Sequence, residues 1–227
     1  MKKSPLFILP VIALALSSCD SVVLGTMEQF GVAKREILVK RVLKARQAQS
    51  ESKEEFQSAL EQFSSLVNYK GGSLESTYNR LNSAYQRSES KARAVKDRND
   101  EVESVAKSLF REWERELNQY SDAGLRAASA RQLADTKSRY NGLMSAMRRA
   151  EGTLDPVLVK FRDNVLFLKH NLNAQVVGSL KSELRSVEIN TANLISEMNR
   201  SIAEADRFIR AMEGGGSGVP AAGRVGS

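Results

Sequence analysis

Apolar residues recur along this chain at alternating spacings of three and four, from Leu38 to Met212. That spacing places them on one face of an α-helix, whereas a half-buried strand would show a spacing of two. Pro156 is the only proline between Cys19 and Glu213, so little else interrupts a helix over that length. The pattern therefore predicts a few long helices that bury a common apolar seam.

Three breaks divide the pattern into four segments. The first segment ends at the glycine pair 71–72, and the hydroxyl of Ser73 can cap the second, which runs to about Tyr120. The third begins after residues 121–124 and the fourth after residues 171–173. At 1.5 Å per residue, each segment would be about 60 to 70 Å long. Such short turns make neighbouring helices antiparallel, so the expected fold is all-α, an elongated antiparallel four-helix bundle with coiled-coil-like packing.

Two alternatives to regular, unbroken helices stay open. A three-helix, spectrin-like or bent bundle is the second fold that the pattern allows. In the third segment Pro156 leaves the spacing in phase, which fits a kinked but continuous helix, although proline crowds the carbonyl of Gly152. The other interpretation is a true break from Gly152 to Pro156, with Asp155 capping a separate short helix. The last segment contains a four-residue stutter between Leu194 and Ile202.

Several predicted seam positions are polar. Layers of this kind usually fix the register of helices at some cost in stability. A ligand cavity, or a seam between subunits in the middle of the bundle, is the other interpretation, and a dry, close-packed core would exclude it. The polar positions are Gln49, Ser52, Ser88, Asn99, Thr136 and Thr191.

Residues 1–18 have the features of a bacterial export signal. Lys2 and Lys3 give a basic start, and Leu6–Leu16 gives an apolar run too short to span a bilayer. The sequence Leu-Ser-Ser-Cys that follows looks like a lipobox, in which Cys19 receives diacylglycerol before the bond ahead of it is cut. We therefore predict lipid attachment at Cys19, the alternative being a free thiol after an ordinary signal. No other apolar run of about 20 residues follows, so the mature chain is not expected to cross the bilayer.

Lipid attachment would hold the mature chain on a membrane, facing the periplasm. Asp20, directly after the cysteine, resembles a membrane-sorting signal that retains lipoproteins at the inner membrane, so we expect the inner rather than the outer membrane. The predicted organisation is a signal peptide over residues 1–18, a lipidated N-terminus and short linker over 19–26, the helical bundle over 27–213 and a glycine-rich disordered tail over 214–227.

Four stretches of the chain resemble a family of proteobacterial lipoproteins catalogued as domain of unknown function 2959. They are residues 27–42 (MEQFGVAKREILVKRV), 56–68 (FQSALEQFSSLVN), 109–120 (LFREWERELNQY) and 155–175 (DPVLVKFRDNVLFLKHNLNAQ), and the last is the most specific. The resemblance covers about residues 27–212. It implies a helical, exported, membrane-attached protein, and it transfers no catalytic or binding residue.

Residues that could carry site chemistry are sparse. Cys19 and His170 are the only cysteine and histidine, whereas zinc and iron sites need several such ligands and a disulfide needs two thiols. His170 falls on the side of its helix opposite Phe161, and acids such as Glu112 and Glu114 alternate with arginines as exposed pairs do. The sequence also has no phosphate loop, nucleophile elbow or dinucleotide fingerprint. We therefore predict no catalytic residue, no metal site, no cofactor and no enzyme activity.

Positive charge is concentrated shortly after the predicted anchor. Six basic residues and one acid, Glu36, leave a surplus of 6 − 1 = +5 between positions 34 and 46. One interpretation is contact with anionic lipid headgroups, worth about 1 kcal/mol per residue near a membrane. The other is that these side chains cover neighbouring helices and pair with local acids. The candidates for contact with an anionic surface are Lys34, Arg35, Lys40, Arg41, Lys44 and Arg46.

Taken as a sequence, the chain favours a non-catalytic function. We expect a lipid-anchored periplasmic helical scaffold or adaptor for a protein partner in the cell envelope. The alternative is a basic bundle that binds an anionic membrane surface or peptidoglycan directly. Removing the two signal lysines from the net charge of +7 leaves 7 − 2 = +5, too little and too evenly spread to indicate nucleic acid. Long amphipathic helices can also pair between chains, so the sequence allows a homo-oligomer.

Overall fold

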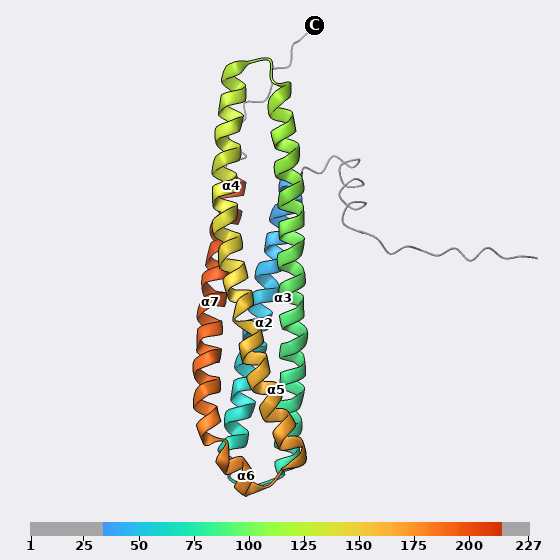
Figure 1. Ribbon diagram of the computed structural model, residues 1–227, viewed down its shortest axis with the longest axis vertical. Coiled ribbons are helices and arrows are strands. Elements are labelled where there is room, and N and C mark those ends of the chain that lie inside the picture. The colour runs from blue at the N-terminus through green and yellow to red at the C-terminus, as the bar shows by residue number, and fades with distance from the viewer. Residues whose placement is uncertain (1–33, 215–227) are drawn as a thin grey trace, which may run out of the picture.

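The predicted segments form four long, antiparallel helical rods in the computed structural model, which describes residues 34–214 (Figure 1). The all-α, elongated four-helix bundle is confirmed, and the three-helix alternative is wrong. The third rod consists of two helices, and a short extra helix precedes the fourth. In chain order the elements are α2 (Lys34–Val67), α3 (Leu74–Glu116), the 3₁₀ turn η1 (Leu117–Gln119), α4 (Ala123–Gly152), α5 (Leu154–His170), α6 (Ala174–Ser179) and α7 (Lys181–Gly214).

The turn between α2 and α3 forms where the sequence predicts it. Gly71 and Gly72 have φ angles of 129° and 106°, a conformation that residues with a Cβ rarely adopt. The hydroxyl of Ser73 then accepts a hydrogen bond of 3.1 Å from the backbone N–H of Ser76 and caps α3. At the opposite end of the bundle, Asp122 caps α4 by accepting a 2.7 Å hydrogen bond from the N–H of Leu125.

The third rod has a true break, at Thr153. The backbone N–H of Thr153 bonds back to the carbonyl of Ala150 at 3.2 Å, which ends α4, and α5 begins at the next residue. Pro156 then lies in the first turn of α5, where an N–H would have no acceptor within the helix. The expected capping role of Asp155 is wrong, because its carboxylate accepts two 2.9 Å hydrogen bonds from Lys96 of α3 instead.

Two apolar clusters fill the bundle, one in each half of its length. The cluster at the α6 end is built around Phe63 and Phe161, whose rings meet edge to face with centroids 6.3 Å apart. The cluster at the other end includes Phe110 and Met147. The predicted seam residue Ile202 is partly exposed, and its neighbour Ser201 is fully buried in its place. The step after Met198 in α7 is therefore three residues, without the predicted stutter. In α3 the spacing likewise favours Tyr78 and Tyr85, which are partly exposed, whereas their neighbours Thr77 and Ala84 are buried.

Polar side chains are buried in the middle of the bundle. Arg46 of α2 pairs with Asp206 of α7, and Lys53 bonds to Asn199, so the residues between these pairs share one layer. That layer contains Gln49, Ser52 and Ser201, each 0% exposed, and their polar atoms have no hydrogen-bond partner within residues 34–214. Gln49 and Ser52 are predicted polar seam positions, whereas Ser201 was not predicted. The other four predicted polar positions are buried as well: Ser88, Asn99, Thr136 and Thr191.

The two ends of the described chain lie at the same end of the bundle. Figure 1 shows the start of α2 and the end of α7 at a similar height in the upper part of the bundle, with α3 and α4 extending beyond both to their turn, whereas α6 closes the opposite end. Within residues 34–214 no helix has an apolar stretch long enough to cross a membrane. The predicted signal peptide and linker, with Cys19 and Asp20, lie outside the described residues, as do residues 27–33 of the predicted bundle and 215–227 of the predicted tail. Gly214, predicted as the first residue of the tail, is the last residue of α7.

Candidate interaction surfaces

The six predicted basic contact residues do not form an open positive surface. Three of them bridge to acids on other helices: Lys34 to Glu112 at 2.9 Å, Arg41 to Glu101 at 2.8 Å and Arg46 to Asp206 at 2.7 Å. Arg35 donates to the backbone carbonyl of Met212. Lys40 and Lys44 are exposed, and neither has an ion-pair partner within residues 34–214.

Glu101 shows how firmly one of these pairs is held. Burial alone would raise the pKa of its carboxyl group, but hydrogen bonds and charge from Arg98 and Arg41 outweigh burial and lower the pKa. The carboxylate therefore stays ionised and keeps the Arg41 guanidinium occupied. This arrangement supports the interpretation of local pairing for Arg41 rather than contact with a membrane.

A second charged network fastens α3 to α4. The guanidinium of Arg148 lies 2.7 Å from Asp100, 2.6 Å from Glu103 and 2.8 Å from Glu151. Burial lowers the pKa of Arg148, but the hydrogen bonds to these carboxylates raise the pKa by more than burial lowers it, so the net shift is upward. Asn99 extends the network by donating a 2.9 Å hydrogen bond to Glu151. Because Arg148 of α4 bonds to two carboxylates of α3, this network is a clamp between the two helices.

The residues with obvious acid–base chemistry lie apart from one another. His170 is exposed at the last residue of α5. Glu112 pairs with Lys34, and Glu114 pairs with Lys137 of α4. Within residues 34–214 no group of three or more histidine, cysteine, aspartate or glutamate side chains could hold a metal ion. The structure therefore brings none of these residues together into a site.

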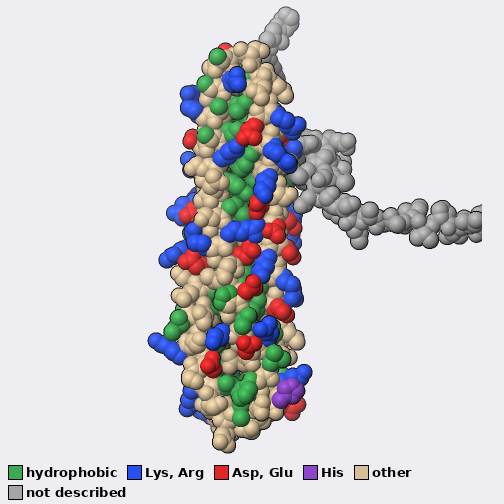
Figure 2. All heavy atoms as spheres, in the orientation of Figure 1, with side chains coloured by type: hydrophobic (Ala, Val, Ile, Leu, Met, Phe, Trp, Pro, Cys, Tyr) green, Lys and Arg blue, Asp and Glu red, His purple; other side chains and the backbone are tan. Residues whose placement is uncertain are grey.

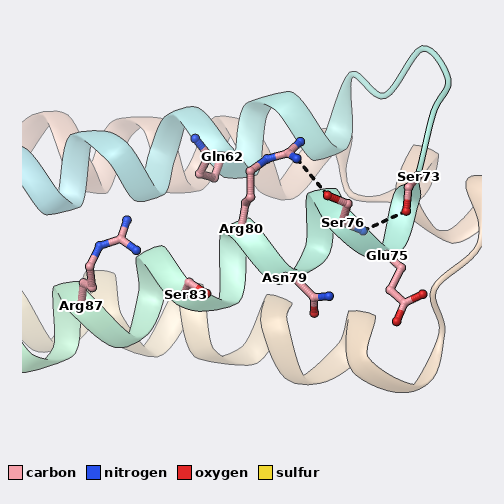
Figure 3. Close-up of a pocket in the computed structure, with 8 residues that line it drawn as sticks. All are labelled: Gln62, Ser73, Glu75, Ser76, Asn79, Arg80, Ser83 and Arg87. Carbon is pink, nitrogen blue, oxygen red and sulfur yellow. Dashed lines mark hydrogen bonds between the residues drawn. The ribbon is translucent and has the colours of Figure 1, made fainter.

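A polar hollow of about 520 Å³ lies on the α2–α3 surface near the α6 end (Figure 3). Some of its groups pair with one another or with a neighbour: Arg80 donates to the hydroxyl of Ser76, whose backbone N–H is bonded to Ser73, and Arg87 bonds to Glu55 of α2. Figure 3 shows the Arg80 side chain reaching from α3 toward Gln62 of α2. The hollow surrounds the helix cap at Ser73 and is lined by polar side chains of α2 and α3.

The solvent-facing side of α5 carries large apolar side chains. Val159 is 41% exposed, Leu166 52% and Phe167 45%, while Phe161 and Leu168 of the same helix are fully buried in the core. Ile189 of α7 is 50% exposed as well. Figure 2 shows green side chains along the length of the visible face, including its lower part, where α5 lies (Figure 1). The α5 face, meaning Val159, Leu166 and Phe167, is thus more apolar than packing of the bundle requires.

A family model described as "Protein of unknown function (DUF2959)" matches residues 24–212. The match includes almost the whole described bundle. The chain belongs to this family. The predicted resemblance is therefore confirmed, with a start three residues before position 27. No curated protein matches the chain.

The DUF2959 description names no activity, so it assigns no role to any residue of this chain. The strongest surface feature inside the matched range, the α5 face, was missed from the sequence. Its signal was present: Val159 and Leu166 are apolar, lie seven residues apart and fall outside the buried spacing of α5. A search for buried positions alone does not detect such a second, solvent-facing row of apolar residues on the same helix.

Proposed function

We propose that this DUF2959 protein is a non-catalytic, lipid-anchored helical adaptor of the bacterial cell envelope. Cys19 would hold it on the periplasmic side of a membrane, and the α5 face would bind a partner protein. The observation that supports the proposal most directly is the α5 face itself. Apolar residues scattered singly over a surface need no explanation, but three on one face of one helix are typical of an interaction site.

The charges beside the α5 face indicate the chemistry of the partner. Lys169 is exposed near the end of α5 and has no ion-pair partner within residues 34–214. Arg162, on the same side of the helix, has only its neighbour Asp163 at 3.3 Å. The complementary surface would therefore be an apolar helix or strand edge flanked by acidic side chains.

The position of α5 fits an adaptor that holds its partner away from the anchor. The chain enters the bundle at Lys34, and α5 ends at the opposite end of the bundle (Figure 1). With 34 residues, α2 runs from Lys34 along most of that length, about 50 Å at 1.5 Å per residue. A protein bound at α5 would thus be held tens of ångströms from the end that carries the predicted lipid.

Crosslinking in living cells tests the partner. A photoreactive residue at Val159 or Leu166 is expected to capture one discrete protein, because both side chains point outward from the α5 face. Matched control positions are Arg93 of α3 and Arg185 of α7, whose side chains are 64% and 79% exposed. Mass spectrometry identifies the adducts. The same adducts from all four positions, or none from the α5 face, would contradict the adaptor function.

Metabolic labelling with palmitate tests the anchor. The natural chain is expected to incorporate the label, and Cys19→Ser is expected to lose it completely, because Cys19 is the only thiol in the sequence. The readout is label on the purified protein, since an uncleaved signal could itself hold the variant on a membrane. Label that persists in Cys19→Ser, or is missing from the natural chain, would rule out lipid attachment at this residue.

A further inference from the structure

A shallow groove runs along the surface between the start of α2 and the end of α7. It consists of two hollows of about 490 Å³ and 370 Å³ that meet at Leu43. Both volumes fall within the range of small-molecule binding sites, which is roughly 300 to 1,000 Å³. The larger hollow lies nearer to Lys34 and the smaller one farther along α2. Leu43 is 40% exposed, one of the more exposed large apolar side chains of the described bundle.

The two hollows differ in chemistry. The larger one has an apolar floor made by Val39, Leu43 and Met212, with Arg35 and Lys40 at its rim together with the carboxylates Glu36 and Glu213. The smaller one has no carboxylate in its lining, which consists of Leu43, Lys44, Arg46, Gln47, Ser50 and Ile202. The groove therefore offers an apolar trough at one end and cations with a hydroxyl group at the other.

Lys40 and Lys44 supply the unpaired charge of this groove. They are one helical turn apart, so both ammonium groups can reach a single anion. Neither has an ion-pair partner within residues 34–214, whereas Arg46 is occupied by Asp206 and Arg35 by the carbonyl of Met212. Of the six basic residues near the start of α2, these two are the ones that the fold leaves exposed to a ligand.

We propose that this groove binds one anionic phospholipid, with an acyl chain on Val39, Leu43 and Met212 and the phosphate beside Lys44 and Lys40. The proposal rests on the lipid anchor at Cys19 for its location: 14 residues separate Cys19 from Lys34, so a membrane that holds the anchor is at most about 50 Å from the start of α2. The order along α2 also fits, because the hollow with the apolar residues lies nearer to Lys34 than the hollow lined by Lys44, as acyl chain and phosphate follow one another in a bilayer leaflet.

A photoreactive phospholipid tests the groove. The full chain, purified in a non-ionic detergent, is irradiated with phosphatidylglycerol that carries a diazirine on its acyl chain, and in parallel with the phosphatidylcholine analogue. Mass spectrometry then locates the label. Label is expected on the peptides that contain residues 39–43 and 212, and it is expected to be much stronger with phosphatidylglycerol, because only this lipid has a net negative charge for the lysines to bind.

Charge neutralisation gives the quantitative test. The double variant K40Q/K44Q is expected to reduce labelling by phosphatidylglycerol about 30-fold, from the usual contribution of a lysine close to anionic lipid. The matched control is K70Q/K181Q, which removes two exposed lysines at the α6 end and is expected to leave labelling unchanged. Equal labelling by both lipids, no difference between the two double variants, or label spread over the whole bundle would overturn the proposal.

Two further outcomes distinguish failure of the groove proposal from failure of the proposed anchor, and a lipid ligand from a protein ligand. The Cys19→Ser chain is expected to be labelled in the same groove, because the detergent assay needs no attachment to a membrane. A natural chain that takes up no palmitate label but still shows the groove label would contradict the anchor alone. Absence of lipid label from residues 39–43 and 212, with capture of an acidic helical peptide there instead, would make the groove a protein-docking site and overturn the lipid assignment.

Discussion

Phe161→Ala is expected to lower the free energy of unfolding by about 3 to 5 kcal/mol, the usual cost of removing a fully buried aromatic side chain. Phe161 is 0% exposed and meets Phe63 of α2 edge to face, so the change leaves a cavity and removes an aromatic contact between two rods. Since domains are commonly stable by only 5 to 15 kcal/mol, a loss of this size is a large part of the total.

Phe167→Ala is the matched control for this experiment. It removes the same side chain from the same helix, but Phe167 is 45% exposed on the α5 face, so the expected loss is below about 1 kcal/mol. Urea unfolding followed by far-ultraviolet circular dichroism measures both variants. Equal losses would mean that Phe167 supports the core as Phe161 does. The α5 face would then be part of the packing, and its proposed role in binding a partner would lose its main support.

The sequence predicts the buried seam well because one physical rule determines it. Residues such as Leu38, Val95, Leu143 and Met198 follow the helical spacing of three and four, and each is buried at 1% exposure or less. The rule fails at Ser201 and Ile202, because a spacing count prefers the apolar neighbour. Whether Ser201 or Ile202 is buried depends on how α7 packs against the other helices, and the spacing of apolar residues does not show that packing.

The partners of the charged residues could not be predicted in the same way. The sequence shows the cations between Lys34 and Arg46, but Glu112, Glu101 and Asp206, which neutralise half of them, lie on helices that only the fold brings near. The break at Thr153 has a related cause. A proline in a first helical turn and a proline at a kink leave similar sequence patterns, and the backbone of Thr153 decides between them.

Gln49→Met is expected to raise the free energy of unfolding by about 1 to 3 kcal/mol, the usual cost of a buried polar group without a hydrogen bond. Both amide atoms of Gln49 lack a partner within residues 34–214, and the side chain is 0% exposed. Methionine is unbranched and adaptable, so it can fill nearly the same space with apolar atoms. Urea unfolding measures the change, and Gln57→Met, at an exposed position of α2, is the control with no expected effect beyond about 0.5 kcal/mol.

The direction of this change decides what the central polar layer does. A more stable Gln49→Met bundle would mean that the layer with Ser52 and Ser201 weakens the fold, so its value would lie in excluding other registers of α2 against α7. In that case the variant is also expected to tolerate mispaired helices, seen as unfolding that is less cooperative than in the natural chain. A loss of more than about 1 kcal/mol would instead show that the amide of Gln49 is satisfied in solution and stabilises the middle of the bundle directly.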